Sequence, residues 1–429
     1  MLGNRFTQLG LLLMLSVVTT VAIAAPPPGK GGGNGGGGGD DGGGDPPPAL
    51  PSVRYEVNLL IPPSDSATQL NDANNHGEVV GWISFIQENG SYGPWLAYIA
   101  SPATSEFTLL ESIVDTSNLP EGYFLSSAVG INDHSVVVGY AANESGDRIP
   151  YAVDLSFVNP VVDLLPRMGF SYEYSRRINN RGEIVGVFRN DSAASTDDHY
   201  TSITYTDLGH YGEPANRNVR DVNGDGIADE LPLDMSQQSP VSLEPLVGST
   251  TSAVHLGNPV DAGPTFIGCT TLPDGVPFRI DVGAFSAEFL TDFIADGTVR
   301  AMDASGAVIG TGLAPAPKGK KFVSFNYRYG SQLEVLPDDG TPVATGRIGE
   351  VLLSTYTGFC VYRDWQDGLG SRAIDVNELV TGEDADLFAA TDKDAWGMTS
   401  EGGIFGKLGA GDYYEIFMLF EVPAVDPNP

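Results

Sequence analysis

The loop at residues 221–229 carries the sharpest chemistry in the chain, and it reads DVNGDGIAD. Oxygen-bearing side chains stand at its first, third, fifth and ninth positions, and a glycine stands at the sixth. Hard oxygen ligands at alternate positions wrap a Ca²⁺ ion, the glycine permits the sharp turn, and the carbonyl of the seventh residue adds an oxygen. The sequence therefore predicts a calcium site. Its ligands are Asp221, Asn223, Asp225, the carbonyl of Ile227, and Asp229.

The kind of calcium loop follows from the residues at its far end. An EF-hand needs a bidentate Glu at loop position twelve, where this chain has Pro232, so the spacing argues against an EF-hand. The spacing instead resembles the calcium loops in blades of integrin-like and VCBS propellers, in which a ninth-position Asp closes the site, as Asp229 would here. That resemblance implies a structural ion that holds a hairpin. The alternative is an acidic, Asx-rich turn that needs no metal.

The sequence contains no motif that is typical of an enzyme active site. It has no G-x-S-x-G elbow and no H-E-x-x-H, and its histidines are dispersed without metal-ligand spacing. The acid-rich segment from Asp375 to Asp394 could present paired carboxylates for glycoside cleavage. A chain with 55 Asp and Glu residues reaches that density without any catalytic role. We therefore predict no catalytic residue and no cofactor other than calcium.

Two further groups of residues remain open at this stage. Cys269 and Cys360 are the only cysteines, and they could pair in an exported protein, but their spacing sets no geometry for a disulfide. A set of aromatic and basic residues could line a binding mouth or could simply pack at a rim. These residues are Tyr172, Tyr174, Arg176 and Arg177.

The charge balance excludes one class of partner. The 429 residues carry a formal charge of −33, and a surface this acidic argues strongly against nucleic acid, because phosphate binding needs a basic surface. Divalent cations could offset part of this charge. Hydrophobic residues make up 41% of the chain, which is enough to bury a core, so global disorder is excluded.

The N-terminus has the pattern of a secretory signal. Arg5 supplies a positive charge, an apolar run follows, and Ala22-Ile23-Ala24 has the small-x-small pattern of a cleavage site, so we predict a signal peptide at residues 1–24 with cleavage after Ala24. Residues 25–52 are rich in Gly and Pro and predict a disordered linker, and residues 424–429 predict a disordered tail. We expect a monomer without a membrane span after cleavage, located in the periplasm or outside the cell.

A short repeat organises the rest of the chain. Each copy has an apolar residue, an Asn or Asp, a turn residue that is usually Gly, and an apolar strand that ends in Gly. The five clear copies end at Gly81, Gly139, Gly186, Gly310 and Gly406. Two worn copies, at residues 260–269 and 344–355, fall in the two long intervals and bring most steps to roughly 40–60 residues, a spacing typical of propeller blades.

The physical chemistry of the repeat predicts an all-β fold. Asn, Asp and Gly favour a turn, the apolar residues form a buried strand, and the last Gly lets another backbone come close. A helix is excluded because Gly recurs inside runs dominated by Val and Ile. We predict a β-propeller-like repeat domain of about seven blades at residues 53–423. Its ring could be closed by pairing of the strands at 53–61 and 413–422.

The residues then point to a known family. Residues 163–186, which read DLLPRMGFSYEYSRRINNRGEIVG, resemble the bacterial extracellular repeat named HAF, as do residues 372–380 and the last copy with residues 417–423. The His-Ala-Phe element of that family is only hinted at here, at residues 94–99 and 149–155. The resemblance implies an exported, propeller-like repeat protein of mostly unassigned function, and it supplies no catalytic residue.

These observations favour an exported, non-enzymatic binding or surface-interaction module with a structural calcium ion. Its ligand would be a glycan, a protein or extracellular matrix. The alternative is an exported hydrolase, for example one that acts on glycans, with a site built from blade loops. The repeats favour the binding module, because a catalytic copy should differ from the others by a motif and none does.

Overall fold

The computed structural model divides into two compact units, residues 1–49 and 50–429, and all described residues belong to the second. The described residues run from Val53 to Pro423. The gaps within this range are at 103, 166–171, 190–199, 206–240, 243–250, 258–265, 272–274, 283, 291–293, 317–318, 329–332, 338–339, 357, 366–369 and 410–413. The predicted signal peptide, linker, calcium loop and C-terminal tail therefore lie outside the described residues.

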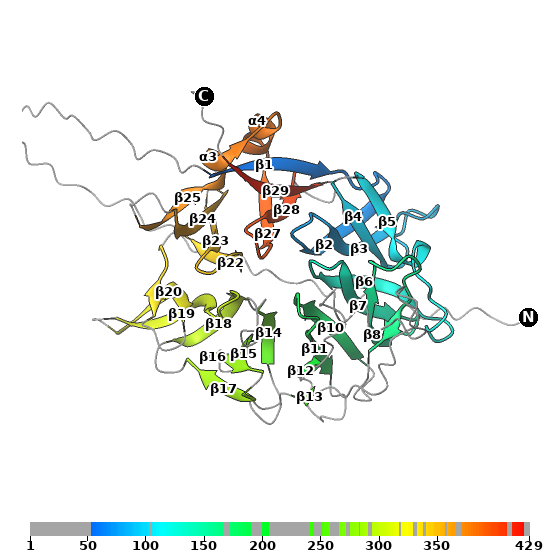
Figure 1. The fold of residues 1–429 in the computed structure, drawn as a ribbon, viewed down its shortest axis with the longest axis horizontal. Helices are drawn as coiled ribbons and strands as arrows, with labels where there is room; N and C mark the ends of the chain where they lie inside the picture. Colours follow the sequence, from blue (N-terminus) through cyan, green and yellow to red (C-terminus); the bar gives the residue numbers. More distant parts are fainter. Residues whose placement is uncertain are drawn as a thin grey trace, which may run out of the picture. The chain divides into compact units, whose positions relative to one another are not determined.

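The described chain is almost entirely β-structure, built from four-stranded antiparallel meanders that we call repeats 1 to 7 (Figure 1). Repeats 1 and 2 are β2 (Ser66–Ala73), β3 (Val79–Phe85), β4 (Leu96–Ser101) and β5 (Glu106–Leu109), then β6 (Phe124–Ile131), β7 (Val136–Ala142), β8 (Arg148–Asp154) and β9 (Asp163–Leu164). Repeats 3 and 4 are β10 (Tyr172–Ile178), β11 (Ile184–Arg189), β12 (Tyr200–Tyr205) and β13 (Val241–Ser242), then β14 (Thr251–Leu256), β15 (Phe266–Thr271), β16 (Pro277–Asp281) and β17 (Ser286–Phe289).

The second half of the chain continues the pattern. Repeats 5 and 6 are β18 (Ala295–Met302), β19 (Val308–Ala316), β20 (Gly319–Tyr327) and β21 (Glu334–Val335), then β22 (Thr341–Thr345), β23 (Val351–Thr355), β24 (Gly358–Asp364) and β25 (Ser371–Asp375). Repeat 7 joins β27 (Lys393–Met398), β28 (Ile404–Leu408) and β29 (Glu415–Pro423) to β1 (Val53–Leu60), with β26 (Val380–Thr381) at its edge. The short helices are η1 (Leu110–Ser112), α3 (Val376–Leu379) and α4 (Ala385–Ala390).

The described strands form six hydrogen-bonded sheets, which are the blades of a β-propeller. The sequence predicted about seven blades. The count differs because β8 and β10 share one parallel residue pair, Arg148 with Tyr172, which merges repeats 2 and 3 into a single eight-stranded sheet. The first strands of successive repeats contact one another in sequence order, and β27 contacts β2, so these inner strands form a closed ring (Figure 1).

The strand-final glycines of the repeat have a steric cause. In repeats 1 and 2 the inner strand bulges opposite the glycine, and its carbonyl turns toward the glycine Cα. A Cβ on Gly81 would lie 1.8 Å from the Gln69 carbonyl oxygen, and a Cβ on Gly139 would lie 2.1 Å from the Ser127 oxygen. The same close approach recurs at Gly310 and Gly406. The prediction that another backbone comes near this position is confirmed.

The predicted closure of the ring is also confirmed. The N-terminal strand β1 pairs antiparallel with β29 along its whole length, from Val53 opposite Pro423 to Leu60 opposite Ile416 (Figure 1). The pairing removes two open sheet edges and joins the start of the described chain to its end.

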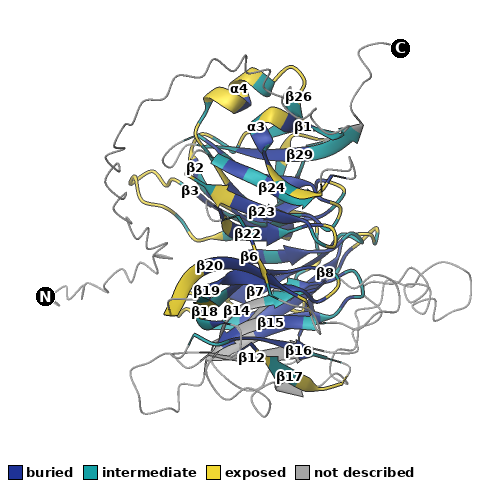
Figure 2. Ribbon diagram, turned by 90° about the vertical axis from the view of Figure 1, so that its left-hand side faces the viewer, coloured by how far each residue is buried: buried dark blue, intermediate teal, exposed yellow. Residues whose placement is uncertain are grey.

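The core lies between neighbouring sheets (Figure 2). Between repeats 6 and 7, Phe359 of β24 stacks on Phe417 of β29 with ring centroids 6.0 Å apart, and Phe388 of α4 meets both rings edge-on. All three rings are buried, and each such burial stabilises the fold by about 1.5–3 kcal/mol. Among the described helices, none has the length and apolar character needed to cross a membrane.

Candidate functional site

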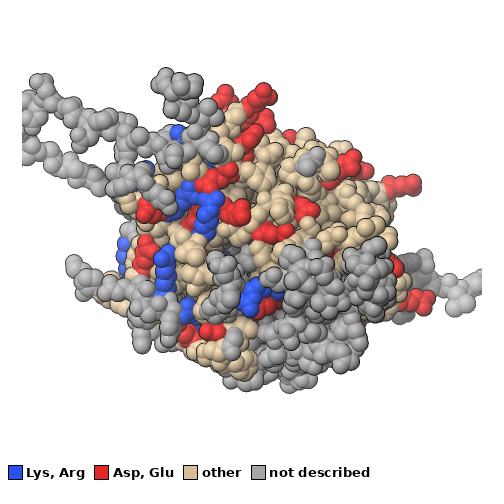
Figure 3. Space-filling model, in the orientation of Figure 1, with Lys and Arg blue, Asp and Glu red and all other residues tan. Residues whose placement is uncertain are grey.

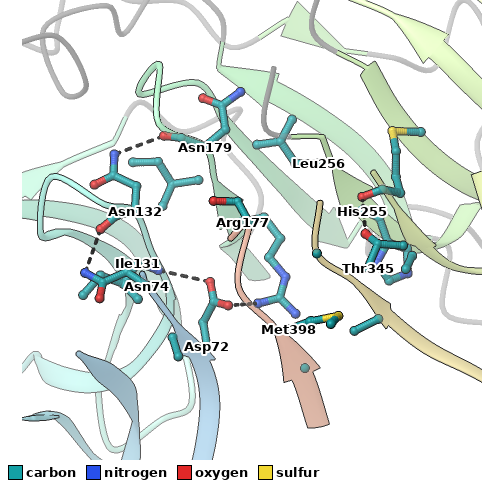
Figure 4. Close-up of a pocket in the computed structure, with 18 of the residues that line it drawn as sticks. Asp72, Asn74, Ile131, Asn132, Arg177, Asn179, His255, Leu256, Thr345 and Met398 are labelled. Carbon is teal, nitrogen blue, oxygen red and sulfur yellow. Dashed lines mark hydrogen bonds and ion pairs between the residues drawn. The ribbon is translucent and has the colours of Figure 1, made fainter. Parts of the chain in front are cut away.

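The inner strands surround a cavity of about 180 Å³ at one end of their ring, which we call the channel-end cavity. Its lining comes from the C-terminal ends of these strands and from the turns that follow them, with residues from every repeat (Figure 4). The cavity therefore lies where the sequence repeat places its Asn and Asp residues.

The first Asn or Asp of each turn shapes the turn itself. The Asn74 side-chain oxygen accepts hydrogen bonds from the backbone N–H groups of His76 and Glu78, each at 3.0 Å. This bond pair recurs in repeats 2, 3 and 5, where the accepting residues are Asn132, Asn179 and Asp303. Asn and Asp are favoured at such positions because their short side chains reach backbone groups two and four residues ahead. The turn chemistry predicted from the sequence is confirmed.

The same residues also connect one repeat to the next, which the sequence did not predict. The Asn74 side-chain N–H donates to the Asn132 carbonyl at 3.1 Å, and the Asn132 side chain donates to the Asn179 carbonyl at 3.0 Å (Figure 4). Asn179 continues to the Gly257 carbonyl at 3.3 Å. These side chains are buried, so each link satisfies a group that would be costly to leave unpaired.

The second residue of each turn forms an outer set of links. The Asp133 carboxylate accepts from the Asn75 backbone N–H at 2.9 Å, from the Asn75 side chain at 2.7 Å, and from the Asn180 side chain. The Asn75 side chain also donates to the Ser400 hydroxyl at 2.7 Å, across the junction between repeats 1 and 7. The Asn pair is therefore used for turns and for packing between repeats, and it is not left available to a ligand.

The cavity also contains an ion pair. Arg177 of β10 points at Asp72 of β2, with nitrogen and oxygen 3.1 Å apart, and the Ile131 backbone N–H donates to the same carboxylate at 3.2 Å (Figure 4). Burial raises the pKa of Asp72 above its usual value, and the positive charge of Arg177 offsets part of this rise. The pair joins repeats 1 and 3 inside the ring, past repeat 2.

A second guanidinium, that of Arg300, lines the same cavity from β18. Arg300 is exposed, and it makes no ion pair or hydrogen bond with any residue in the described part of the chain. Trp396 and Met398 of β27 add apolar surface to the lining. The cavity can accept an oxygen-bearing group of a small ligand or of one side chain, because no described residue uses the Arg300 donors.

The charged cavity residues leave a trace in the sequence that a closer comparison of the copies could have found. Asp72 and Arg177 both stand two residues before the first turn residue. Gly130, Ala301 and Gly397 occupy this position in repeats 2, 5 and 7. His255 occupies it in repeat 4. Two opposite charges at a position that holds Gly or Ala in most other repeats indicate an ion pair inside the ring.

The residues predicted from sequence have different outcomes. The calcium ligands Asp221, Asn223, Asp225, Ile227 and Asp229 lie outside the described residues. Among the residues that the structure does describe, no group of three or more His, Cys, Asp or Glu could hold a metal ion. Arg177 lies in the cavity, whereas the side chains of Tyr172, Tyr174 and Arg176 are outside the described set.

The remaining candidates do not form a site with the cavity. Asp375 caps α3 by accepting from the Asn377 backbone N–H at 2.8 Å, and no carboxylate of the segment 375–394 lines the cavity. Cys360 lies in β24 and Cys269 in β15, in two sheets between which the chain forms the sheet of repeat 5. The Cys269 side chain is not among the described residues, so the disulfide stays open.

Comparison with known proteins supports the fold and identifies no biochemical activity. No protein-family model and no curated protein matches the sequence. Among solved structures, the β-propeller domain of the Trilobed protease from Pyrococcus furiosus, described as having an open velcro topology, aligns with a TM-score of 0.50 and 10% identity over 85% of this chain and 97% of that domain. The chain is a β-propeller.

A second solved structure, the acylaminoacyl peptidase of Pyrococcus horikoshii, aligns with a TM-score of 0.47 and 12% identity over 85% of this chain. The alignment covers 53% of that peptidase, so this propeller chain spans about half of its length. At such identities the likeness is one of fold alone.

Proposed function

We propose that this propeller is an exported, non-enzymatic binding module and that its ligand enters the channel-end cavity. The observation that carries the proposal is the Arg300 guanidinium, which lines the cavity without an ion pair among the described residues. The neighbouring turn residues are used by the fold, as the Asn75 and Asp133 contacts show. A donor that no described residue uses is available to a ligand.

The cavity supports binding better than catalysis. Its carboxylates are Asp72, which pairs with Arg177, and Asp133, which accepts hydrogen bonds from two Asn side chains. A hydrolase of the glycosidase type needs one carboxylic acid and one carboxylate that are both open to the substrate. Neither cavity carboxylate meets this need, so the hydrolase alternative is not favoured.

The size of the cavity limits what can enter. About 180 Å³ holds a single side chain or a comparable group, so a larger ligand would rest on the rim and insert one part. We expect that part to carry an oxygen acceptor, such as a carboxylate or a carbonyl. A glycan, a protein or a matrix component could present it.

The test is a glycan and peptide array, read beside a hydrolase substrate panel with the same mature protein. We expect retention on the array without turnover, and Arg300→Ala should weaken retention by about tenfold or more, because charge-assisted hydrogen bonds are lost. Lys320→Ala removes one exposed positive charge from β20 outside the cavity and serves as the control. Turnover that one Asp or Glu substitution abolishes would overturn the proposal.

We also propose that the loop at 221–229 binds Ca²⁺ and that the ion has a structural role. Its support is the spacing of the oxygen ligands in the sequence. Calcium should raise the melting temperature of the parent protein, and Asp225→Ala should remove this rise. A parent melting curve that is unchanged by a chelator would refute the site.

Export is the remaining proposal, and it rests on the signal-like N-terminus. The mature protein should begin at Ala25 and be recovered outside the cytoplasm. Intact mass of the protein from the native host measures both. A mature chain that retains residues 1–24 would contradict it.

A further inference from the structure

A second cavity, of about 660 Å³, lies between repeat 6 and the closing strands β1 and β29. Its lining contains three arginines, Arg328, Arg347 and Arg363. In a chain with 22 Lys and Arg against 55 Asp and Glu, such a concentration is unusual. Figure 3 shows basic side chains gathered over this side of the face, among scattered acidic ones.

The cavity arises where the repeat departs from its pattern. In repeats 1 and 3 the first turn Asn donates to a Glu four residues later, as Asn74 does to Glu78 at 2.6 Å and Asn179 to Glu183 at 2.7 Å. In repeat 6 the first position is Gly346, which has no side chain to donate. Glu350, at the fifth position, is therefore available to other partners.

Glu350 binds an arginine in place of the missing Asn. Its carboxylate is buried and accepts from Arg363 at 2.6 Å and from the Arg347 backbone N–H at 3.1 Å. Arg363 also binds Glu421 of β29 at 2.6 Å and lies over the Trp365 ring at 4.2 Å from its centroid. Arg363 is thus held in place by two carboxylates and an aromatic face.

The mouth of the cavity holds the other two arginines. Arg347 pairs with Glu421 through one guanidinium nitrogen, and 47% of its side chain is exposed. Arg328, at the end of β20, is exposed and lies against Gly349, where an added Cβ would be 2.5 Å from its guanidinium nitrogen. The lining contains three carboxylates, those of Glu350, Glu421 and the exposed Asp364. Arg328 forms an ion pair with none of them, nor with any other described residue.

We propose that this arginine pocket binds the oxyanion group of a small ligand: a carboxylate, a sulfate or a phosphate. Arg328 supplies a guanidinium fork that no described carboxylate occupies, Arg347 supplies its remaining donors, and the exposed Ser371 hydroxyl lies in the same lining. Planar guanidinium forks match such oxyanions with paired hydrogen bonds. The pocket is separate from the channel-end cavity and does not depend on the function proposed for it.

The test is calorimetric titration of the full mature protein, at low ionic strength, with sulfate, phosphate and glucuronate in separate arms. We expect one arm to saturate, and the arm that does so identifies the source of the oxyanion. Arg328→Ala should weaken that binding by about tenfold, and Arg328→Lys should restore it in part, because a lysine keeps the charge but not the fork.

Two controls separate this site from general charge and from the channel. Lys320→Ala removes the same charge outside the pocket and should leave the affinity unchanged, as should Arg300→Ala in the channel-end cavity. Lack of saturation in all three arms would overturn the proposal. Equal losses of affinity in Arg328→Ala and Lys320→Ala would also overturn it. The melting temperatures of both variants are measured as well, and equal values exclude unfolding as the cause of a lost affinity.

Discussion

Repeats 1 to 3 and repeat 6 carry a five-residue segment at the same place, directly after the inner strand, and its hydrogen bonds differ between them. In repeats 1 to 3 an Asn at the first position fixes the turn and bonds to the next repeat, so most polar groups of the turn are satisfied by the fold. In repeat 6 the first position is Gly346, which has no side chain to bond to Glu350, and Glu350 forms an ion pair with Arg363 instead. Regular copies build the ring, whereas the irregular copy builds a pocket. Departures from a repeat are therefore the places to look for binding.

The largest effect is expected at the strand-final glycine, which repeats 1 and 2 share and repeat 6 lacks. Gly139→Ala places a Cβ 2.1 Å from the Ser127 carbonyl oxygen and 2.6 Å from the Tyr151 hydroxyl, both buried. We expect a loss of about 3–5 kcal/mol in the free energy of unfolding, measured by urea titration.

Repeat 6 has Leu353 at the position of Gly139. Its side chain fits because the neighbouring Gly340 has none, and a Cβ on Gly340 would lie 2.8 Å from the Leu353 Cβ. Leu353→Ala should therefore destabilise for the opposite reason, by about 2–4 kcal/mol through a cavity. A parent-like unfolding midpoint for Gly139→Ala would show that the bulge is not a fixed feature.

The buried charge of repeat 6 should give the next largest effect. Glu350→Ala removes a carboxylate that is 1% exposed and leaves Arg363 with Glu421 alone. We expect a loss of about 3 kcal/mol, because Arg347, Arg363 and Glu421 are then left with one excess positive charge beside a buried site. Glu88→Ala, which removes an exposed carboxylate from the loop after β3, is the control. Equal losses in the two variants would contradict the role of the network.

A smaller effect is expected for the regular turn. Asn132→Ala removes the side-chain oxygen that binds two backbone N–H groups and the N–H that reaches the Asn179 carbonyl. Loss of a buried cap and a buried link should cost about 2 kcal/mol. The link to Asn179 would be refuted if Asn132→Asp, which keeps the acceptor but loses the donor, were as stable as the parent.

The channel ion pair should give the smallest effect, and it depends on pH. Burial raises the pKa of Asp72 in the folded state. The folded protein therefore binds a proton on this carboxylate more readily than the unfolded chain does. The contribution of Asp72 to stability then grows as pH falls through its folded-state pKa. Relative to Asp72→Asn, the parent should therefore be more stable at pH 4 than at pH 7. Urea titrations at both values measure this difference, and a difference of the opposite sign would show that the ion pair outweighs burial.

Much of the fold could be predicted from the sequence because its cause is local. The turn at Asn74, the close approach at Gly81 and the pairing of β1 with β29 each follow from residue type and repeat spacing. The links from Asn132 to Asn179 could not be predicted, because they depend on how two neighbouring repeats pack. The merging of repeats 2 and 3 into one sheet has the same origin.

The candidate sites were harder to predict than the fold. Arg177 was singled out by its position next to the repeat, but Asp72 and Arg300 come from strands far away in the sequence. The arginine pocket joins segments of three neighbouring repeats that only their packing brings together, since Glu421 reaches Arg363 from β29. The calcium loop stays a prediction from spacing.

One paired measurement tests most directly whether turn residues such as Asn75 stabilise the fold while Arg300 binds the ligand. Arg300→Ala and Asn75→Ala are compared for melting temperature and for retention on the array. Asn75→Ala should lower the melting temperature and keep the affinity, because its contacts join repeats 1, 2 and 7. Arg300→Ala should keep the melting temperature and lose the affinity. The reverse assignment, with affinity lost in Asn75→Ala and retained in Arg300→Ala, would contradict the account.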